Sequence, residues 1–288
     1  MIMLPRVSGM LHSLLLIILL GTIFSILYYI NNEPSVASAA IEPPKPIPSD
    51  SSTSPAIAEP GWSLIQPGLE WRVIDIYNDQ NQLLESIHIW RLDQKYFRLD
   101  VAFDATPKSL DTWQRETNAS IVVNGGYYSI ANEKYFPDGL TIVNGKASGR
   151  SFNGFGGMLA IKSSGAELRW LVQKPYDPYE PFHAALQSFP ILVRPGGELG
   201  FGAERENNVG ARRTVIAQDK HGRILLMVAP QGYFTLHRLS LYLTESDLDL
   251  DIAVNLDGGG STGILVANPR EIISPTRPIP FVILAHPR

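Results

Sequence analysis

Three short stretches of the sequence contain side chains that could do chemistry, and two of them also contain glycines. They are VVNGGYYS around Asn124, ARRTVIA around Arg213 and NLDGGGST around Asp257. Asp257 ends an apolar run, so its carboxyl group is expected to be partly removed from water and to have a raised pKa. Such a group is suited to proton transfer, and the planar guanidinium of Arg213 matches the oxygens of a phosphate. These residue types favour acid–base chemistry beside a site for an anionic group.

Each stretch also has a purely structural interpretation. Asn-Gly suits a type I′ hairpin turn, so the NGG at 124–126 could simply reverse the chain. DGGGST has neither P-loop spacing nor a dinucleotide fingerprint, and a turn explains it equally well when it is taken alone. Arg212 and Arg213 are neighbours, so on a strand one should face the functional side and the other solvent. A surface ion pair with Glu204 or Glu206 is the alternative for them.

Composition excludes several kinds of site. The chain has 288 residues, a formal net charge of −4 and no basic block, so nothing predicts a nucleic-acid partner. It has no cysteine, which excludes disulfides, zinc–thiolate sites and a thiol nucleophile. No HxH, HExxH or EF-hand spacing occurs, so no metal site and no cofactor are predicted. A divalent cation could replace a catalytic carboxylate, but no ligand spacing indicates one.

The first 60 residues predict membrane targeting followed by a tether. Residues 11–30 are apolar, without a charged residue if His12 is neutral, and are long enough to span a bilayer. Arg6 precedes this run, so the rest of the chain is expected outside the cytoplasmic membrane. Residues 1–32 are either a signal anchor or a signal peptide, since ASA at 37–39 fits a cleavage site.

The predicted location follows from this choice. An uncleaved anchor gives a single-pass protein of the cell membrane with an extracytoplasmic domain, and cleavage gives a secreted or periplasmic protein. Residues 33–60 are rich in proline, serine and alanine and predict a disordered tether. Residues 61–288 are then the folded domain.

Short apolar runs bounded by turn residues dominate this domain. The stretches 71–77, 86–92 and 96–103 alternate between apolar and polar residues, which predicts antiparallel strands with one wet face. The stretch 119–124 is apolar until its end and predicts a buried strand. The domain is therefore expected to be α+β, with a mixed, mostly antiparallel central sheet and one or two helices packed on a face.

Two segments have the start signals of a helix. Thr106, followed by a proline, predicts an N-cap, and Thr235 predicts another. After Thr235, Leu236, Leu239 and Leu243 fall on one helical face. Each predicted helix precedes an apolar run that ends in Asn or Asp and glycine.

The ordered set of motifs resembles the phosphodiester glycosidase family. Asn124 to Tyr128 (NGGYY) looks like the family's NGG-aromatic-aromatic motif, and the further similar segments are PDGLTIVNGK at 137–146, ALQSFPILVRPGG at 185–197, RRTVIA at 212–217 and NLDGGGST at 255–262. The resemblance covers the chain from about Trp71 to its end. One departure is Ala217, which stands where the family commonly has glycine.

The resemblance implies hydrolysis of the bond between a sugar's anomeric carbon and a phosphodiester oxygen. It implies that Asp257 activates water or stabilises an oxocarbenium-like transition state, and that Arg213 grips the phosphate. Asn124 would orient sugar hydroxyls or the phosphate. The predicted catalytic residues are thus Asp257, Arg213 and Asn124, and the predicted substrate-binding residues are Gly125, Gly126, Tyr127, Gln187, Thr214, Gly258, Gly259, Gly260 and Ser261.

Several matters stay open at this stage. Glycosidases usually need a second carboxyl group, for which Asp138, Glu204 and Glu206 are equal candidates by position. The substrate is expected to be a GlcNAc-1-phosphodiester-like sugar or a related envelope or exopolysaccharide glycan. The expected partners are this carbohydrate or sugar-phosphate substrate and the membrane, through the N-terminal helix. The alternative function is a non-catalytic glycan-binding module in polysaccharide assembly.

Overall fold

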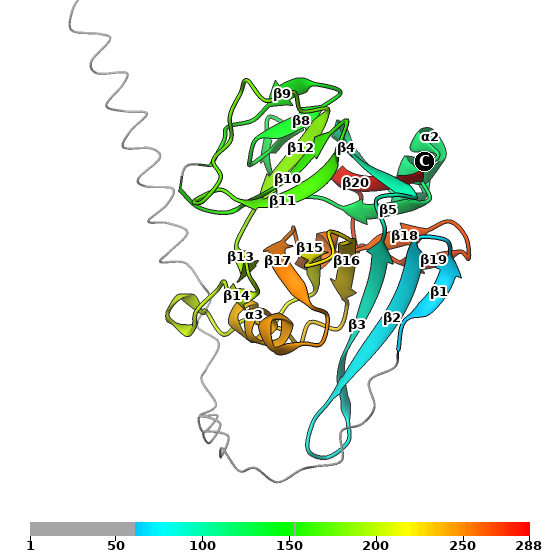
Figure 1. The fold of residues 1–288 in the computed structure, drawn as a ribbon, viewed down its shortest axis with the longest axis vertical. Coiled ribbons are helices and arrows are strands. Elements are labelled where there is room, and N and C mark those ends of the chain that lie inside the picture. The colour runs from blue at the N-terminus through cyan, green and yellow to red at the C-terminus, as the bar shows by residue number, and fades with distance from the viewer. Residues whose placement is uncertain (1–60, 153) are drawn as a thin grey trace, which may run out of the picture. The chain divides into compact units, whose positions relative to one another are not determined.

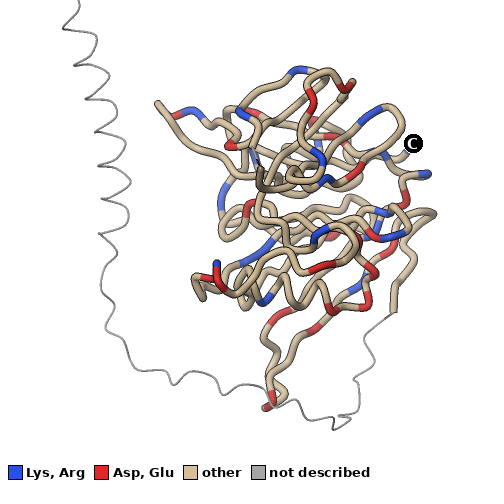
Figure 2. The backbone as a smooth tube through the Cα atoms, turned by 60° about the vertical axis from the view of Figure 1, so that its left-hand side comes forward, with Lys and Arg blue, Asp and Glu red and all other residues tan. Residues whose placement is uncertain are grey.

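A computed structural model of the protein describes residues 61–152 and 154–288. The predicted signal or anchor helix and the predicted tether, residues 1–60, lie outside the described residues. Within the described part, no helix is long and apolar enough to cross a membrane. Basic and acidic residues are scattered over this part, as Figure 2 shows.

The largest sheet has eight strands in the order β1-β2-β3-β16-β15-β17-β13-β14 (Figure 1). Its strands are β1 (Ser63–Gln66), β2 (Leu69–Tyr77), β3 (Leu83–Leu92), β13 (Ile191–Arg194), β14 (Glu198–Leu199), β15 (Arg213–Asp219), β16 (Ile224–Ala229) and β17 (Leu250–Asn255).

Two five-stranded sheets and one hairpin complete the fold. One sheet has the order β11-β10-β12-β8-β9, and the other has the order β19-β18-β5-β20-β4. The strands of the first are β8 (Thr141–Val143), β9 (Lys146–Ser148), β10 (Gly157–Lys162), β11 (Gly165–Trp170) and β12 (Ala184–Ser188). The strands of the second are β4 (Phe97–Lys108), β5 (Ile121–Asn124), β18 (Ile264–Val266), β19 (Glu271–Ile273) and β20 (Ile279–Pro287), and the hairpin is β6 (Tyr128–Ala131) with β7 (Lys134–Pro137).

The α+β class is confirmed, but the prediction of one mixed central sheet is wrong. Strands of the described residues form three larger sheets, and their pairings are antiparallel, as in β15 with β17 and β20 with β5. The predicted strands at 71–77 and 86–92 pair with each other as β2 and β3. The stretch at 96–103 instead becomes part of β4, whose partner is β20 in another sheet. Local alternation does not specify which distant strand a segment joins.

The main core lies between the eight-stranded sheet and the two five-stranded sheets. Alternate residues of β15 and β17 face opposite sides, so Ile216 and Val254 enter this core while Ala217 and Ala253 face away from it. From the opposite side the core receives Val123 of β5 and other buried side chains of the smaller sheets. This packing brings the end of β5 against the ends of β15 and β17.

The two described α-helices cover different sheets. Helix α3 (Leu236–Glu245) begins at the predicted cap, because the Thr235 side chain accepts a hydrogen bond from the Arg238 N–H at 3.2 Å. Its Leu239 and Leu243 are buried against the outer face of the eight-stranded sheet. Helix α2 (Leu110–Thr117) buries Leu110 and Trp113 in a cluster with side chains of β5, β18 and β20.

The predicted start of the first helix is wrong. Strand β4 continues through Thr106 to Lys108, and Ser109 caps α2 by accepting a hydrogen bond from the Thr112 N–H at 3.1 Å. The pairing of β4 with β20 is irregular between Phe103 and Lys108. Pro107 lies in this irregular part of the ladder, where the missing N–H of a proline costs no regular hydrogen bond.

Candidate active site

The three stretches meet where β5 and β17 end and β15 begins. Strands β15 and β17 are antiparallel neighbours, with Val215 opposite Asn255, so the start of β15 lies beside the end of β17. The end of β5 joins them through one side chain. Asn124 accepts hydrogen bonds from the Thr214 hydroxyl at 2.7 Å and the Gly263 N–H at 3.0 Å, and its amide nitrogen donates to the Asp257 carbonyl at 2.6 Å.

This arrangement excludes the hairpin interpretation of NGG. The strand after the glycines, β6, pairs with β7 and not with β5. Gly125 instead donates its N–H to the Phe281 carbonyl at 2.8 Å and accepts from the Asp257 N–H at 3.1 Å. A Cβ on Gly125 would lie 3.1 Å from Leu186 and Phe281, and one on Gly126 would lie 3.0 Å from the Gln187 carbonyl. The two glycines therefore allow the chain to pass close between β12 and β20.

The Asp257 carboxyl group lies in the glycine loop, partly shielded from water. One carboxyl oxygen accepts from the Gly258 N–H at 2.9 Å. Burial raises the pKa of Asp257, as its position at the end of an apolar strand predicts. Hydrogen bonds from Ser261 and Gly258 and the positive charge of Arg277 act in the opposite direction, and the negative charge of Asp138 adds to the rise in pKa.

Tyr127 forms the wall of the site next to Asp257. Its hydroxyl oxygen accepts a hydrogen bond from the Asn255 amide at 2.6 Å, and its ring stacks on Phe189 with centroids 4.6 Å apart. Burial and the neighbouring Asp257 charge raise the pKa of Tyr127 to about 12, and the Arg213 charge lowers it in part. These interactions place the Tyr127 hydroxyl within the electrostatic reach of both predicted catalytic charges.

Arg213 is half-buried and its guanidinium is held by backbone carbonyls. Nε donates to the Phe234 carbonyl at 3.0 Å, and Nη2 donates to the Val209 carbonyl at 3.2 Å. Burial lowers the pKa of Arg213, and the charges of Tyr127 and Glu206 oppose this effect. No ion pair among the described residues joins Arg213 to a glutamate, so the predicted alternative of a surface salt bridge is not what holds it.

Arg212 also contacts the site loops, so the prediction that one of the two arginines faces solvent is not met. It is half-buried, and its Nη2 donates to the Ser274 carbonyl at 2.9 Å. Its own carbonyl accepts from the Gly259 N–H at 2.8 Å. A Cβ on Gly258 would lie 2.7 Å from the same carbonyl oxygen. Arg212 thus supports the glycine loop through its backbone as well as its side chain.

Thr214 and Ser261 have defined partners in the same region. The Thr214 hydroxyl is fully buried and donates to Asn124, so it positions that side chain rather than opening to the site. The Ser261 hydroxyl lies 3.3 Å from the Tyr128 hydroxyl and bonds to the Asp257 carboxyl group. Both residues therefore act on the predicted catalytic residues, and Ser261 does so directly on the carboxylate.

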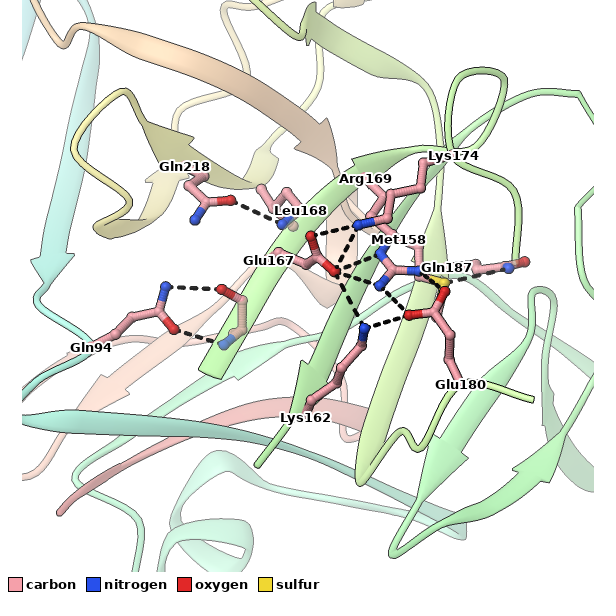
Figure 3. A network of polar contacts seen from close by, with 11 residues as sticks. Gln94, Met158, Lys162, Glu167, Leu168, Arg169, Lys174, Glu180, Gln187 and Gln218 are labelled. Atoms are coloured by element: carbon pink, nitrogen blue, oxygen red, sulfur yellow. Dashed lines mark hydrogen bonds and ion pairs between the residues drawn. The ribbon is translucent and has the colours of Figure 1, made fainter. Parts of the chain in front are cut away.

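Gln187 lies in the wall behind the glycines, with both ends of its amide used by protein groups. Its oxygen accepts from the Phe152 N–H at 2.8 Å, and its nitrogen donates to the Ser151 hydroxyl at 2.9 Å. The amide nitrogen also lies 3.9 Å from the Met158 sulfur, as Figure 3 shows. Direct contact of Gln187 with substrate stays a prediction, whereas its hold on residues 151 and 152 is present in the structure.

A charged network lies on the same sheet as Gln187 (Figure 3). The guanidinium of Arg169 is almost fully buried and bonds to the carboxylates of Glu167 and Glu180. Lys162 also pairs with Glu180, and the exposed Lys174 pairs with Glu167 at 3.0 Å. Hydrogen bonds from Arg169 and Lys162 lower the pKa of Glu180 to about 2.

Of the three candidates for a second carboxyl group, the structure brings Asp138 to the site. Its charge raises the pKa of Asp257, and its carboxylate accepts a hydrogen bond from Ser129. Glu204 is exposed and pairs with Arg205 at 3.5 Å. Glu206 accepts from the His237 N–H at 2.7 Å at the start of α3. The Glu206 charge acts on Arg213, so Glu206 lies nearer that side of the site, whereas Glu204 bonds within its own loop.

Sequence reasoning gave Asn255 no role, although it lies in the NLDGGGST stretch, and it missed Arg277 altogether. Asn255 connects Tyr127 to β17, and its position two residues before Asp257 is the signal that could have identified it. Arg277 acts electrostatically on Asp257 from an exposed proline-containing segment, where no periodicity or spacing marks it. Among residues 61–152 and 154–288, no group of three or more His, Asp or Glu is placed to hold a metal ion.

A family model described as phosphodiester glycosidase matches residues 117–286, a range that contains all of the predicted site residues. No curated protein matches the chain. Among solved structures, the catalytic domain of zebrafish N-acetylglucosamine-1-phosphodiester alpha-N-acetylglucosaminidase, auto-inhibited by its pro-peptide, is similar with a TM-score of 0.61 and 20% identity. That similarity covers 77% of this chain and 85% of the zebrafish chain.

Two bacterial structures have the same fold. A hypothetical protein from Synechocystis is 13% identical with a TM-score of 0.53, covering 77% of this chain and 62% of that one. A putative exported protein from Burkholderia pseudomallei is 12% identical with a TM-score of 0.50, covering 70% and 74% of the two chains. At these identities the similarity concerns the fold and not the substrate.

Proposed function

Because the chain belongs to the phosphodiester glycosidase family, we propose that it hydrolyses the bond between a sugar's anomeric carbon and a phosphodiester oxygen. The observation that carries this proposal is that the charges of Asp257 and Arg213 both act on Tyr127, where β5 and β17 end and β15 begins. A carboxyl group, a protonated phenol and a cation are thereby brought to one glycine-lined place. Glycosyl transfer to water needs this combination of proton transfer and charge stabilisation.

The leaving group of such a reaction is a phosphate monoester, which needs charge stabilisation more than protonation. In the proposed reaction, Asp257 accepts a proton from a water molecule while the water oxygen bonds to the anomeric carbon. The bond between that carbon and the phosphate oxygen breaks, and the phosphate monoester leaves with the electron pair. Asp257 then releases its proton to solvent. Asp138 is the proposed second carboxylate, supported by its electrostatic effect on Asp257.

Tyr127 and Arg213 have complementary parts in this proposal. The Tyr127 phenol stays protonated in the physiological range because its pKa is about 12. Its oxygen accepts from Asn255, so its proton is available for a phosphate oxygen or a sugar hydroxyl. Arg213 supplies a fixed positive charge nearby, held by two carbonyl oxygens. A pre-positioned cation stabilises developing negative charge without having to reorganise.

The proposed substrate is a GlcNAc-1-phosphodiester-like sugar or a related envelope or exopolysaccharide glycan. The family supports the phosphodiester bond, and the choice of sugar is our expectation. The proposed location is the outer side of the cytoplasmic membrane. The apolar run at 11–30 and the Pro- and Ser-rich stretch at 33–60 support it.

The test is an assay of the full chain in detergent micelles with the methyl phosphodiester of GlcNAc-1-phosphate. Release of GlcNAc and methyl phosphate by the wild type, and its loss in Asp257→Asn, is the expected result. Saturable binding without any product after long incubation would indicate a glycan-binding module instead.

A further inference from the structure

Arg277 lies directly over the glycine loop that carries Asp257. A Cβ on Gly260 would be 2.6 Å from both Nε and Nη2 of Arg277, so the guanidinium occupies the space that a side chain at 260 would need. Gly260 has no positive φ, which means that its backbone does not itself require glycine. The absence of a side chain at residue 260 thus lets the guanidinium approach the loop closely.

The segment that carries Arg277 is attached to the loop. The Thr276 N–H donates to the Gly260 carbonyl at 2.9 Å, and the Thr276 hydroxyl lies 3.3 Å from the same oxygen. Two residues earlier, the Ser274 carbonyl accepts from Arg212. These contacts attach the segment just before Arg277 to the glycine loop and to Arg212, so the backbone at residue 277 lies beside the loop that carries Asp257.

The guanidinium of Arg277 is available to a ligand. It is exposed, and the hydrogen bonds and ion pairs of residues 61–152 and 154–288 do not include it. It borders a hollow of about 240 Å³ that Ser109, Asp111 and Thr276 also line. The one carboxylate there, Asp111, already pairs with Arg270. The Arg277 guanidinium therefore has free N–H donors beside both this hollow and the loop that carries Asp257.

Arg213 differs from Arg277 in this respect. Two of its guanidinium nitrogens donate to the carbonyls of Phe234 and Val209, and the side chain is half-buried. Arg213 can contribute its positive charge at a distance, but most of its N–H donors already bond to backbone carbonyls. A bidentate grip on phosphate requires two free parallel N–H groups.

We propose that Arg277 is the residue that binds the substrate's phosphate by direct hydrogen bonds, with Arg213 acting as a fixed charge behind it. This inference rests on the proposed function, and it assigns to Arg277 the direct contact with the phosphate of the phosphodiester. The bridging phosphate then lies over Gly260, between the Asp257 carboxylate and the hollow. The alcohol esterified to the phosphate on the far side extends into that hollow.

Electrostatics around Asp257 agree with this position. Burial raises the pKa of Asp257, and the hydrogen bonds from Ser261 and Gly258 lower it. The positive charge of Arg277 lowers it as well. A phosphate bound to Arg277 would neutralise that charge. The proton affinity of Asp257 would then rise when substrate binds, which helps it to accept a proton from water.

The test compares wild type, Arg277→Ala and Arg277→Lys as full chains. Calorimetry with methyl phosphate measures phosphate binding without turnover, and kcat/KM is measured for the GlcNAc-1-phosphomethyl diester and for 4-nitrophenyl α-GlcNAc, which lacks phosphate. Arg277→Ala is expected to weaken methyl phosphate binding and diester hydrolysis about 10- to 100-fold. Its activity relative to wild type on the nitrophenyl glycoside should change less than threefold. Lysine should restore only part of the loss, because it lacks the planar fork.

The control is Arg98→Ala, which removes an exposed arginine of β4 that pairs with Asp100 and does not line the hollow. It should leave both measurements unchanged, and all variants should keep the melting temperature of the wild type. Hydrolysis of the diester by Arg277→Ala at the wild-type rate would overturn the role of Arg277 and leave the proposed function intact. Failure of the wild type to bind methyl phosphate would also overturn it. Methyl phosphate binding that depends on Arg277, without turnover by the wild type, would retain the phosphate site and reject the glycosidase.

Discussion

The amide nitrogen of Asn124 donates a hydrogen bond to the carbonyl oxygen of Asp257 at 2.6 Å. This contact joins the end of β5, in one five-stranded sheet, to the loop after β17 in the eight-stranded sheet. The same side chain accepts from Thr214 and Gly263, so a single amide serves three backbone or hydroxyl groups. The position of the catalytic loop therefore depends on how these two sheets pack.

The first prediction concerns this bridging amide. Asn124→Ala should lower the free energy of unfolding by about 2–5 kcal/mol, because it leaves buried groups of Thr214, Gly263 and Asp257 without partners. Urea denaturation followed by circular dichroism measures the change. Gln80→Ala, which truncates an amide in an exposed turn, is the control and should change stability by less than about 0.5 kcal/mol. Equal effects of the two variants would contradict the bridging role.

The second prediction concerns the protonation of Asp257. Burial raises its pKa in the folded protein, so the folded state holds this proton more tightly than the unfolded state does. Stability contributed by the protonated form is present below the unfolded pKa of about 4 and is lost as the pH rises through the folded pKa. Asp257→Asn should therefore be more stable than the wild type at pH 7, and the difference should shrink towards pH 4.

The same variant should lose activity by about 10²–10⁴-fold, the usual contribution of an acid–base group. Thermal melting between pH 4 and 7, together with hydrolysis of the GlcNAc-1-phosphomethyl diester, checks both statements. Asp138→Asn is the comparison, since Asp138 contributes to the rise in the pKa of Asp257. Lower stability of Asp257→Asn at pH 7 would show that the ionised carboxylate stabilises the fold.

The third prediction separates two neighbouring glycines. Gly258→Ala would place a Cβ 2.7 Å from the Arg212 carbonyl and force the loop away, at a cost of about 1–3 kcal/mol and with loss of activity. Gly259 has a φ of +56° and open space around its Cβ position, so Gly259→Ala should cost about 1–2 kcal/mol from the backbone alone. Gly259→Ala should retain most of the activity. A reversed order of activity would show that the Arg212 carbonyl does not fix the loop.

The fourth prediction concerns the charged network around Arg169. Arg169→Met should lower stability at pH 7 by about 1–3 kcal/mol, because it removes charge-assisted hydrogen bonds to two partly exposed glutamates that keep their lysine partners. Lys174→Met removes an exposed lysine that pairs with Glu167 and should cost at most about 1 kcal/mol. Chemical denaturation of both variants measures the difference.

The network also has a pH signature. The pKa of Glu180 is lowered to about 2 in the folded protein, so its stabilising effect is present above about pH 4.5 and is lost as the pH falls towards 2. In Arg169→Met this loss of stability in acid should be smaller than in the wild type. An unchanged acid transition would mean that Lys162 alone lowers the pKa of Glu180.

Local signals predicted the parts of the fold that local chemistry determines. The cap at Thr235 is present because a threonine side chain satisfies an N–H three residues later, which the sequence itself reveals. Thr106 gave the same signal but lies in β4, because pairing with β20 carries the strand as far as Lys108. The competing cap, Ser109, has its own partner in Thr112. Thr106 and Ser109 are both suitable N-caps, and the pairing of β4 with β20 determines that the helix begins after Ser109.

The site was predictable where glycines and polar groups follow apolar strands. Asn124 bonds to the backbone of Asp257, the charges of Asp257 and Arg213 both act on Tyr127, and the raised pKa of Asp257 follows from its place at the end of β17. Arg277 could not be predicted, because its importance comes from the fold of an exposed segment over Gly260. The division of work between the two arginines likewise depends on which carbonyl oxygens lie nearby.

The place of β20 between β5 and β4 has a consequence for biosynthesis. During translation β4 and β5 emerge from the ribosome before β20, the strand that lies between them and pairs with both. Until β20 is made, one edge of β4 and one edge of β5 lack their hydrogen-bond partners, and Trp113 lacks the Ile279 carbonyl that accepts from its indole N–H at 2.9 Å. This five-stranded sheet therefore depends on contacts between residues far apart in the sequence, which form late in folding.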